Sequence, residues 1–259
     1  MTAGLPDELL DRPFAAVREA CAEVAARARR VAIDPAALGW EPAKGEDEKR
    51  RQHRAVLLGL VGGLAEEPAV LEAVAARIGP YLKSRAKLEA NLAGPVVELA
   101  ARSGDARLFD AYLRAMKGAR TPQERTRFEL AIGSFRAPAL VERALSLALS
   151  DAVPTQDVVP LLVRLLGNPA ARERTWEFVR ERWKELSARV SPGLAGRLVS
   201  ALPALQKPLY KRQVAAFFAA HPLPTAARAL RQALERFDLD AELRERALPE
   251  LRDYLHNLV

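Results

Sequence analysis

The segment from Asn168 to Leu186 has the pattern of one amphipathic helix, and no other feature of the sequence constrains the fold as much. Asn168 is a suitable N-cap, and Pro169 would occupy the first helical position, where its missing N–H costs nothing. Large apolar side chains then recur on one helix face: Trp176, Val179, Trp183 and Leu186. Two of the three tryptophans share this face. We therefore expect a helix over 169–187 that anchors much of the core.

Proline and glycine divide the chain into about a dozen helical segments joined by short links. Good helix formers dominate, and we find neither alternating strand patterns nor hairpin turns. The expected helices are 13–31, 47–63, 68–79, 93–103, 106–118, 122–133, 138–149, 155–166, 169–187, 193–203, 208–220, 224–236 and 240–258. Short links favour antiparallel neighbours. The sequence therefore predicts an all-α fold, an irregular α-superhelix in which antiparallel pairs stack as in a HEAT or armadillo solenoid.

Charge and hydropathy narrow the possible partners. The formal charge of +7 is spread thinly and no nucleic-acid-binding motif is present, so we expect no nucleic-acid partner. No apolar run approaches the ~20 residues of a membrane span, so we expect no membrane partner. Cys21 is the only cysteine, which excludes an internal disulfide and suits a cytoplasmic protein. If the chain is a fragment, its own start does not decide export.

Several short motifs follow one another in an order typical of a known family. They are Gly39-Trp40-Glu41-Pro42, Gly45-Glu46, Arg54, Thr121-Pro122-Gln123-Glu124, Thr155-Gln156-Asp157, the Asn168 segment, and Val214 with Phe217-Phe218. This ordered set resembles the C-terminal helical domain of the zinc aminopeptidases related to aminopeptidase N and the endoplasmic-reticulum aminopeptidases. The resemblance runs from about Gly39 to the C-terminus. It is weaker at the end, where Leu243 stands in place of a common tryptophan.

The resemblance implies both an architecture and a role. It predicts a single α-superhelical domain over 1–259, with a leading helix in 1–35 at a possible cut edge and the family-like region over 39–259. In the family this domain closes one side of the chamber that holds the peptide and limits substrate access. The chain would then be the non-catalytic C-terminal domain of a bacterial-type zinc aminopeptidase. Its partners would be the catalytic domain of the same parent chain and a peptide substrate.

The catalytic motif of that family is missing from this chain. A zinc peptidase of this kind carries H-E-x-x-H on a helix, and the sequence contains no such run. His53, His221 and His256 show no metal-ligand spacing, and Cys21 continues an apolar stripe typical of a core residue. We therefore expect no catalytic residue, no metal ligand and no cofactor in this chain. Zinc would belong to the missing catalytic domain.

A second hypothesis stays open, a free-standing helical adaptor that binds a protein or peptide on its concave face. An uninterrupted upstream coding frame encoding H-E-x-x-H would favour the peptidase, and a genuine start at Met1 would favour the adaptor. If the domain belongs to a larger enzyme, the surface facing the catalytic domain should be unusually apolar.

Arg54 is the one candidate site residue. It borders an apolar stripe formed by Leu57, Val61 and Leu64. In one interpretation it lines the inner wall and binds a peptide or orients a neighbouring helix, and the family often has an arginine here. In the other, which we favour, its stem covers apolar surface while its charged head reaches water.

Overall fold

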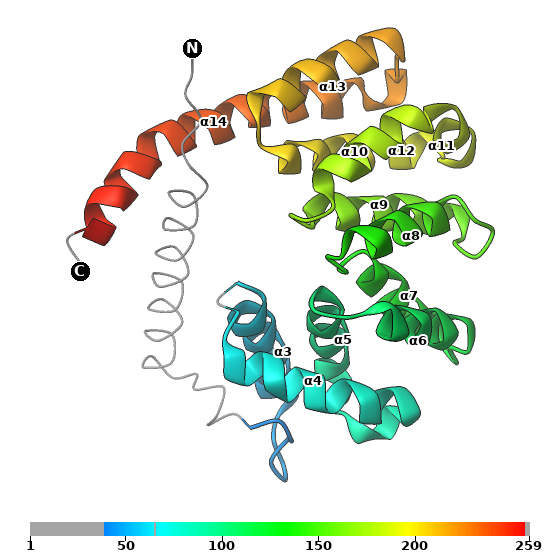
Figure 1. The fold of residues 1–259 in the computed structure, drawn as a ribbon, viewed down its shortest axis with the longest axis vertical. Helices are drawn as coiled ribbons and strands as arrows, with labels where there is room; N and C mark the ends of the chain where they lie inside the picture. The colour runs from blue at the N-terminus through cyan, green and yellow to red at the C-terminus, as the bar shows by residue number, and fades with distance from the viewer. Residues whose placement is uncertain (1–38, 65, 257–259) are drawn as a thin grey trace. The chain divides into compact units, whose positions relative to one another are not determined.

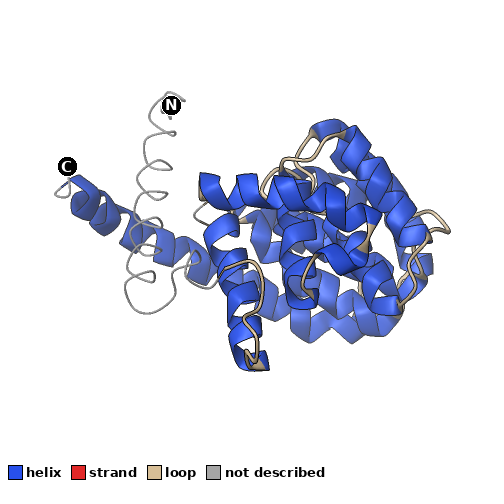
Figure 2. Ribbon diagram, turned by 90° about the horizontal axis from the view of Figure 1, so that it is seen from below, coloured by secondary structure: helices blue, strands red, loops and turns tan. Residues whose placement is uncertain are grey.

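Every regular element that the structure describes is a helix. The computed structural model describes residues 39–64 and 66–256, which contain twelve α-helices, labelled α3 to α14, and four short 3-10 helices (Figure 1). Figure 2 accordingly shows only helices and loops in this part of the chain. The all-α prediction is confirmed, while the HEAT or armadillo type stays a prediction. The expected helix 13–31, with Cys21, lies outside the described residues.

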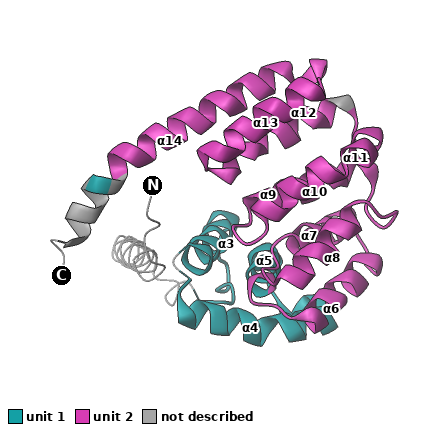
Figure 3. Ribbon diagram, turned by 45° about the horizontal axis from the view of Figure 1, so that its top comes forward, with its two compact units in different colours: residues 1–100, 249–259 teal, residues 101–248 magenta. Residues whose placement is uncertain are grey.

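The chain separates into two compact units, Met1–Ala100 with Pro249–Val259, and Ala101–Leu248 (Figure 3). The helices of the first unit are α3 (Glu48–Gly63), α4 (Pro68–Lys83), η1 (Arg85–Lys87), η2 (Ala90–Leu92) and most of α5 (Ala93–Arg102). Those of the second are α6 (Ala106–Lys117), α7 (Pro122–Ile132), α8 (Pro138–Ala148), α9 (Thr155–Gly167), α10 (Arg172–Glu181), α11 (Trp183–Arg189), α12 (Pro192–Ala201), η3 (Leu202–Leu205), α13 (Pro208–Ala220), η4 (Pro224–Ala226) and most of α14 (Ala227–His256).

Helix α3 packs against α4 and η2 in the first unit. It begins after Asp47, whose carboxylate accepts a hydrogen bond from the amide of Arg50 at 2.7 Å and so caps the helix. Near its end, Gly62 lets the neighbouring side chains approach closely. A Cβ atom there would lie 2.6 Å from a methyl of Leu99 and 3.1 Å from one of Val70. Any larger residue at this position would therefore require the side chain of Leu99 to move.

Helix α9 is the centre of the second unit. It packs against α7, α8, α10 and α12, and its apolar face is buried: Val158, Val159, Leu161, Leu162, Leu165 and Leu166. The opposite side carries Gln156, Asp157 and Arg164, so the helix is amphipathic. The central helix is thus the one before the tryptophan-rich segment.

Three expected helix boundaries are wrong, among them the end of the helix 68–79, which continues as α4 to Lys83. The segment 169–187 is two helices, α10 and α11, because Arg182 leaves helical geometry at φ −108° and ψ 21°. Asn168 does not cap α10, which begins after Ala171. Its side-chain oxygen accepts from the amide of Ala170 at 3.1 Å, in the turn before α10, and its amide nitrogen donates to the carbonyls of Gly133 at 3.1 Å and Phe135 at 2.8 Å.

The third wrong boundary is the break expected between 236 and 240. The chain continues through it as one helix, α14. Arg236 and Asp240 form an ion pair of 2.6 Å across the expected break, and Phe237 is buried. The pair at a spacing of four residues favours helix, and neither proline nor glycine lies between them.

Candidate functional site

The described residues offer no ready metal centre. Within residues 39–64 and 66–256, no group of three or more His, Cys, Asp or Glu side chains is placed to hold a metal ion. His53 and His221 are both exposed, and the ring of His221 stacks on Phe217 with centroids 4.4 Å apart. In the same part of the chain, no helix is long and apolar enough to cross a membrane.

Arg54 lies in a buried ion pair. Its side chain is only 5% exposed, and its Nη2 donates to Oε1 of Glu46 at 2.5 Å. The interpretation that placed its charged head in water is therefore wrong. The loop before α3 explains the difference, because Gly45 adopts φ +79° there and Glu46 follows directly. Glu46 and Arg54 are eight positions apart in the sequence, and the turn at Gly45 brings their side chains together.

The same contact determines the charge state of Glu46. The hydrogen bond from Arg54 holds the pKa of the Glu46 carboxyl below its usual value. Arg50 adds a second, longer contact of 3.2 Å to the same oxygen. The group is therefore a fixed ion pair that links the loop to α3, and whether Arg54 touches a peptide stays a prediction.

A small pocket lies in the second unit beside α11. We call it the Trp183 pocket; its volume is 240 Å³ and it is lined by Trp183, Ser187, Val190, Ala195, Leu198, Leu223, Pro224 and Thr225. The pocket is mainly apolar and has room for about one large side chain, since whole-ligand sites start near 300 Å³. The helical spacing of Trp183 with Trp176, Val179 and Leu186 indicates a core face, so the sequence pattern does not reveal this pocket.

Aromatic contacts fix the Trp183 wall of this pocket. The Trp183 ring meets Phe217 edge-on with centroids 5.4 Å apart and Phe218 with centroids 5.7 Å apart. The fully buried Trp176 meets Phe217 at 5.4 Å and donates through Nε1 to Gln213 at 3.0 Å. Such edge-to-face contacts hold the rings in place, so this wall is rigid.

A second hollow of 420 Å³ lies between α6 and α8, lined by Phe109, Leu113, Glu142, Arg143, Ser146, Leu147 and Ser150. Its charged groups already have partners. Arg143 pairs with Asp110 at 2.5 Å and lies over the Phe109 ring, and Glu142 pairs with Arg174 at 2.6 Å. This hollow is therefore less suited to a charged ligand than its polar lining suggests.

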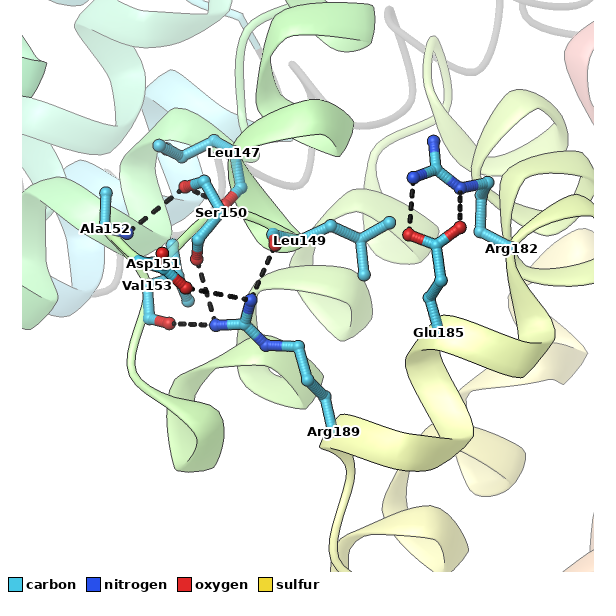
Figure 4. Close-up of polar contacts among 9 residues, drawn as sticks. All are labelled: Leu147, Leu149, Ser150, Asp151, Ala152, Val153, Arg182, Glu185 and Arg189. Carbon is cyan, nitrogen blue, oxygen red and sulfur yellow. Dashed lines mark hydrogen bonds and ion pairs between the residues drawn. The ribbon is translucent and has the colours of Figure 1, made fainter.

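Two arginines hold the loop of residues 149–154, which we call the α8–α9 loop. Arg189 of α11 donates to the carbonyls of Leu149 at 2.6 Å and of Ser150 and Val153 at 2.9 Å each (Figure 4). Arg125 of α7 donates to the carbonyl of Ala152 at 2.6 Å. Cations are favourable at a helix C-terminus, so the two guanidinium groups fix this loop against α7 and α11.

One face of α3 is apolar and exposed. Val56, Leu60 and Leu64 recur every four residues and are 60%, 48% and 66% exposed. We call this face the α3 stripe. Scattered apolar side chains need no explanation, but an aligned set on one helix is typical of a surface that contacts a partner.

Residues 39–64 and 66–256 are thus all-helical in their regular elements and supply no metal-binding cluster. Residues 10–239 match the family described as ERAP1-like C-terminal domain. The chain therefore belongs to this family, and the match runs through both compact units.

Curated relatives agree with this assignment. The chain is 29% identical to Aminopeptidase M1 of Arabidopsis thaliana over 214 residues, which are 79% of this chain and 24% of that protein. It is 27% identical to Aminopeptidase M1-B of Oryza sativa subsp. japonica over 243 residues, which are 86% of this chain and 26% of that protein. The chain thus spans about a quarter of the length of these relatives.

Proposed function

We propose that this chain is the non-catalytic C-terminal domain of a zinc aminopeptidase, acting as one domain over 1–259 that caps the active-site chamber and gates or contacts the peptide. The observation that carries the proposal is the family match over most of the chain, together with relatives named aminopeptidases of which it spans about a quarter. The partners would be the catalytic domain of the same parent chain and the peptide, with no nucleic acid. The single cysteine favours a cytoplasmic location.

The zinc chemistry would belong to the catalytic domain. The sequence has no H-E-x-x-H run, and among the described residues no cluster suited to a metal occurs. These residues do not fit a zinc site, so we assign them no chemical step. The chain alone should bind no zinc stoichiometrically and release no amino acid from an aminoacyl amide. Chelator-sensitive aminopeptidase activity from the pure chain would contradict the proposal.

The α3 stripe supports a partner in the same parent chain. A face with three aligned apolar side chains is the kind of surface expected where another domain packs. A free-standing adaptor would also need a contact surface, so the stripe does not separate the two hypotheses. The genomic frame upstream of Met1 does: an open frame with H-E-x-x-H supports the peptidase, and a stop codon directly upstream supports the adaptor.

The Trp183 pocket supports contact with the peptide. Its size and apolar lining suit one large side chain of a bound peptide. The test compares two exposed helical serines in the parent enzyme. Ser187 lines the pocket and donates to the carbonyl of Lys184, whereas Ser200 on α12 donates to that of Gly196 and lies outside the lining.

We expect Ser187→Trp to raise KM for long peptides about tenfold while leaving KM for aminoacyl amides unchanged. Ser200→Trp, the matched control, should change neither. Equal kinetics of the two variants on long peptides would remove the pocket from the proposal. Arg54→Ala tests the inner-wall role in the same assay, and unchanged kinetics on short and long peptides would reject that role.

A further inference from the structure

We propose that ionisation of Glu129 controls the hold of Arg125 on the α8–α9 loop. The inference does not depend on the proposed function, because it concerns contacts within the second unit alone. It starts from two carboxyl oxygens that are buried and lack a hydrogen-bond donor, next to an arginine that is committed elsewhere.

Glu129 lies one helical turn after Arg125 on α7. Its side chain is 1% exposed, and neither of its oxygens accepts a hydrogen bond from the described residues. Arg125 is within ion-pair distance, with its Nε 3.5 Å from Oε2 of Glu129. Meanwhile Nη2 of Arg125 donates to the carbonyl of Ala152 at 2.6 Å. Arg125 therefore lies closer to the loop carbonyl than to the carboxyl of Glu129.

The surroundings favour the neutral carboxyl. Burial, and then the negative charge of Asp157 on α9, raise the pKa of Glu129 to about 7, while Arg125 lowers it in part. Arg164, also on α9, packs its stem against Gly133 at the end of α7. The charged side chains of α6, which packs along α7, lie at exposed or half-buried positions: Arg107, Asp110, Arg114 and Lys117. Asp151, in the loop itself, is fully exposed and 3.9 Å from Arg189.

We expect Arg125 to take different partners when Glu129 is neutral and when it is ionised. A neutral Glu129 needs no counter-ion, so Arg125 remains on the carbonyl of Ala152, as the structure has it. An ionised carboxylate at this depth needs a donor, because a buried charge without one is costly. Arg125 is 32% exposed and so has room to turn. Above neutral pH its guanidinium should therefore move from Ala152 to Glu129.

The loop would then have one permanent attachment and one that depends on pH. The three bonds from Arg189 run to backbone carbonyls and involve no carboxyl, whereas the bond from Arg125 competes with Glu129. Raising the pH from 6 to 8 should loosen the part of the loop around Ala152 and leave the part around Leu149 in place.

Amide hydrogen exchange in the full chain tests this proposal. The readout is the amide of Ala152, which donates to the hydroxyl of Ser150 within the loop. After correction for intrinsic exchange, we expect its protection factor to fall about fivefold between pH 6 and pH 8. In Glu129→Gln it should not change with pH. Glu142→Gln, an exposed carboxylate on α8, is the control and should behave as the wild type does.

Arg125→Gln provides a second, independent variant. It removes the donor, so protection at Ala152 should be low at both pH values. The proposal is overturned if Glu129→Gln retains the wild-type pH dependence, or if Arg125→Gln does. It is also overturned if the carboxyl carbon of Glu129, followed by NMR, titrates near the ordinary glutamate value of 4.5.

Discussion

Glu46 in the first unit and Glu129 in the second are both buried carboxyls close to an arginine, yet their pKa values move in opposite directions. The Glu46 side chain is 3% exposed and that of Glu129 is 1% exposed. Arg54 donates to Glu46 at 2.5 Å, and the pKa of Glu46 is lowered. Arg125 stays 3.5 Å from Glu129, and the pKa of Glu129 is raised to about 7.

The difference teaches that a donated hydrogen bond, and not burial, decides the sign of the shift. Burial raises the pKa of both groups. Only Glu46 receives a donor that outweighs it, because Arg54 points into the loop, whereas Arg125 points at a carbonyl. A carboxylate that accepts a charged donor is stabilised, and one that does not prefers to keep its proton.

The largest expected effect comes from building another buried carboxylate without a donor. Asn168→Asp replaces an amide that donates to two carbonyls with a group that can only accept. We expect a loss of about 4 kcal/mol in the free energy of unfolding at pH 7, measured by urea denaturation. Part of the loss should be recovered at pH 4, as the new carboxyl takes up a proton.

Gln213→Glu is the matched control for that variant. The side-chain oxygen of Gln213 accepts from Nε1 of Trp176, and a carboxylate retains this role. The free energy of unfolding should change by no more than about 0.5 kcal/mol. If both variants lose equal stability, added charge alone explains the effect, and the donor argument is wrong.

A smaller effect is expected when the buried carboxyl of Glu129, which accepts no hydrogen bond from the described residues, is replaced by an amide. The pKa of Glu129 is higher in the folded chain than the ordinary 4.5, so the native state retains the proton longer, and wild-type stability falls as pH rises from 4.5 to about 7. Glu129→Gln removes this cost. Urea denaturation should show the variant about 2 kcal/mol more stable at pH 8 and close to wild type at pH 5. A constant difference at both pH values would count against the raised pKa.

The corresponding substitution in the first unit, Glu46→Gln, should lower the free energy of unfolding at pH 8, whereas Glu129→Gln should raise it. The pKa of Glu46 is lowered, so its contribution to stability is present above the ordinary value of 4.5 and is lost as pH falls through the lowered pKa. Glu46→Gln should therefore be less stable than wild type at pH 8, with the difference shrinking on acidification. We expect this to be the smallest of the three effects, because the amide oxygen still accepts from Arg54.

Glu41→Gln, at an exposed position in the same loop, is the control. Thermal unfolding at pH 8 should not distinguish it from wild type. If Glu46→Gln is more stable than wild type, the desolvation cost of the Glu46–Arg54 pair exceeds its attraction. The opposite effects expected for Glu46 and Glu129 would then be wrong.

Helix positions were the most predictable part of the fold. Prolines at the first turn mark the starts of α7, α8 and α13, and each observed start agrees with the sequence pattern. This works because proline fixes its own φ and lacks a donor that the first turn does not use. Local chemistry alone therefore placed most of the helices.

Prediction failed where distant partners decide the backbone. Asn168 was expected to cap a helix, but its side-chain oxygen accepts from the amide of Ala170 in the turn before α10, and its amide nitrogen donates to the distant carbonyls of Gly133 and Phe135. Pro80 was expected to end a helix at 79, yet α4 continues to Lys83. The candidate site shows the same limit: Arg54 could be found from its place beside an apolar stripe, but its burial depends on the turn at Gly45.

The sequence by itself determined that this chain is helical and which family it resembles, because helix propensity, proline placement and motif order are properties of neighbouring residues. Only the tertiary structure decided which carboxyls receive a donor, how the Trp183 pocket forms and which arginines hold the α8–α9 loop. Those outcomes depend on side chains that meet across helices, and their strength depends on water being excluded where they meet.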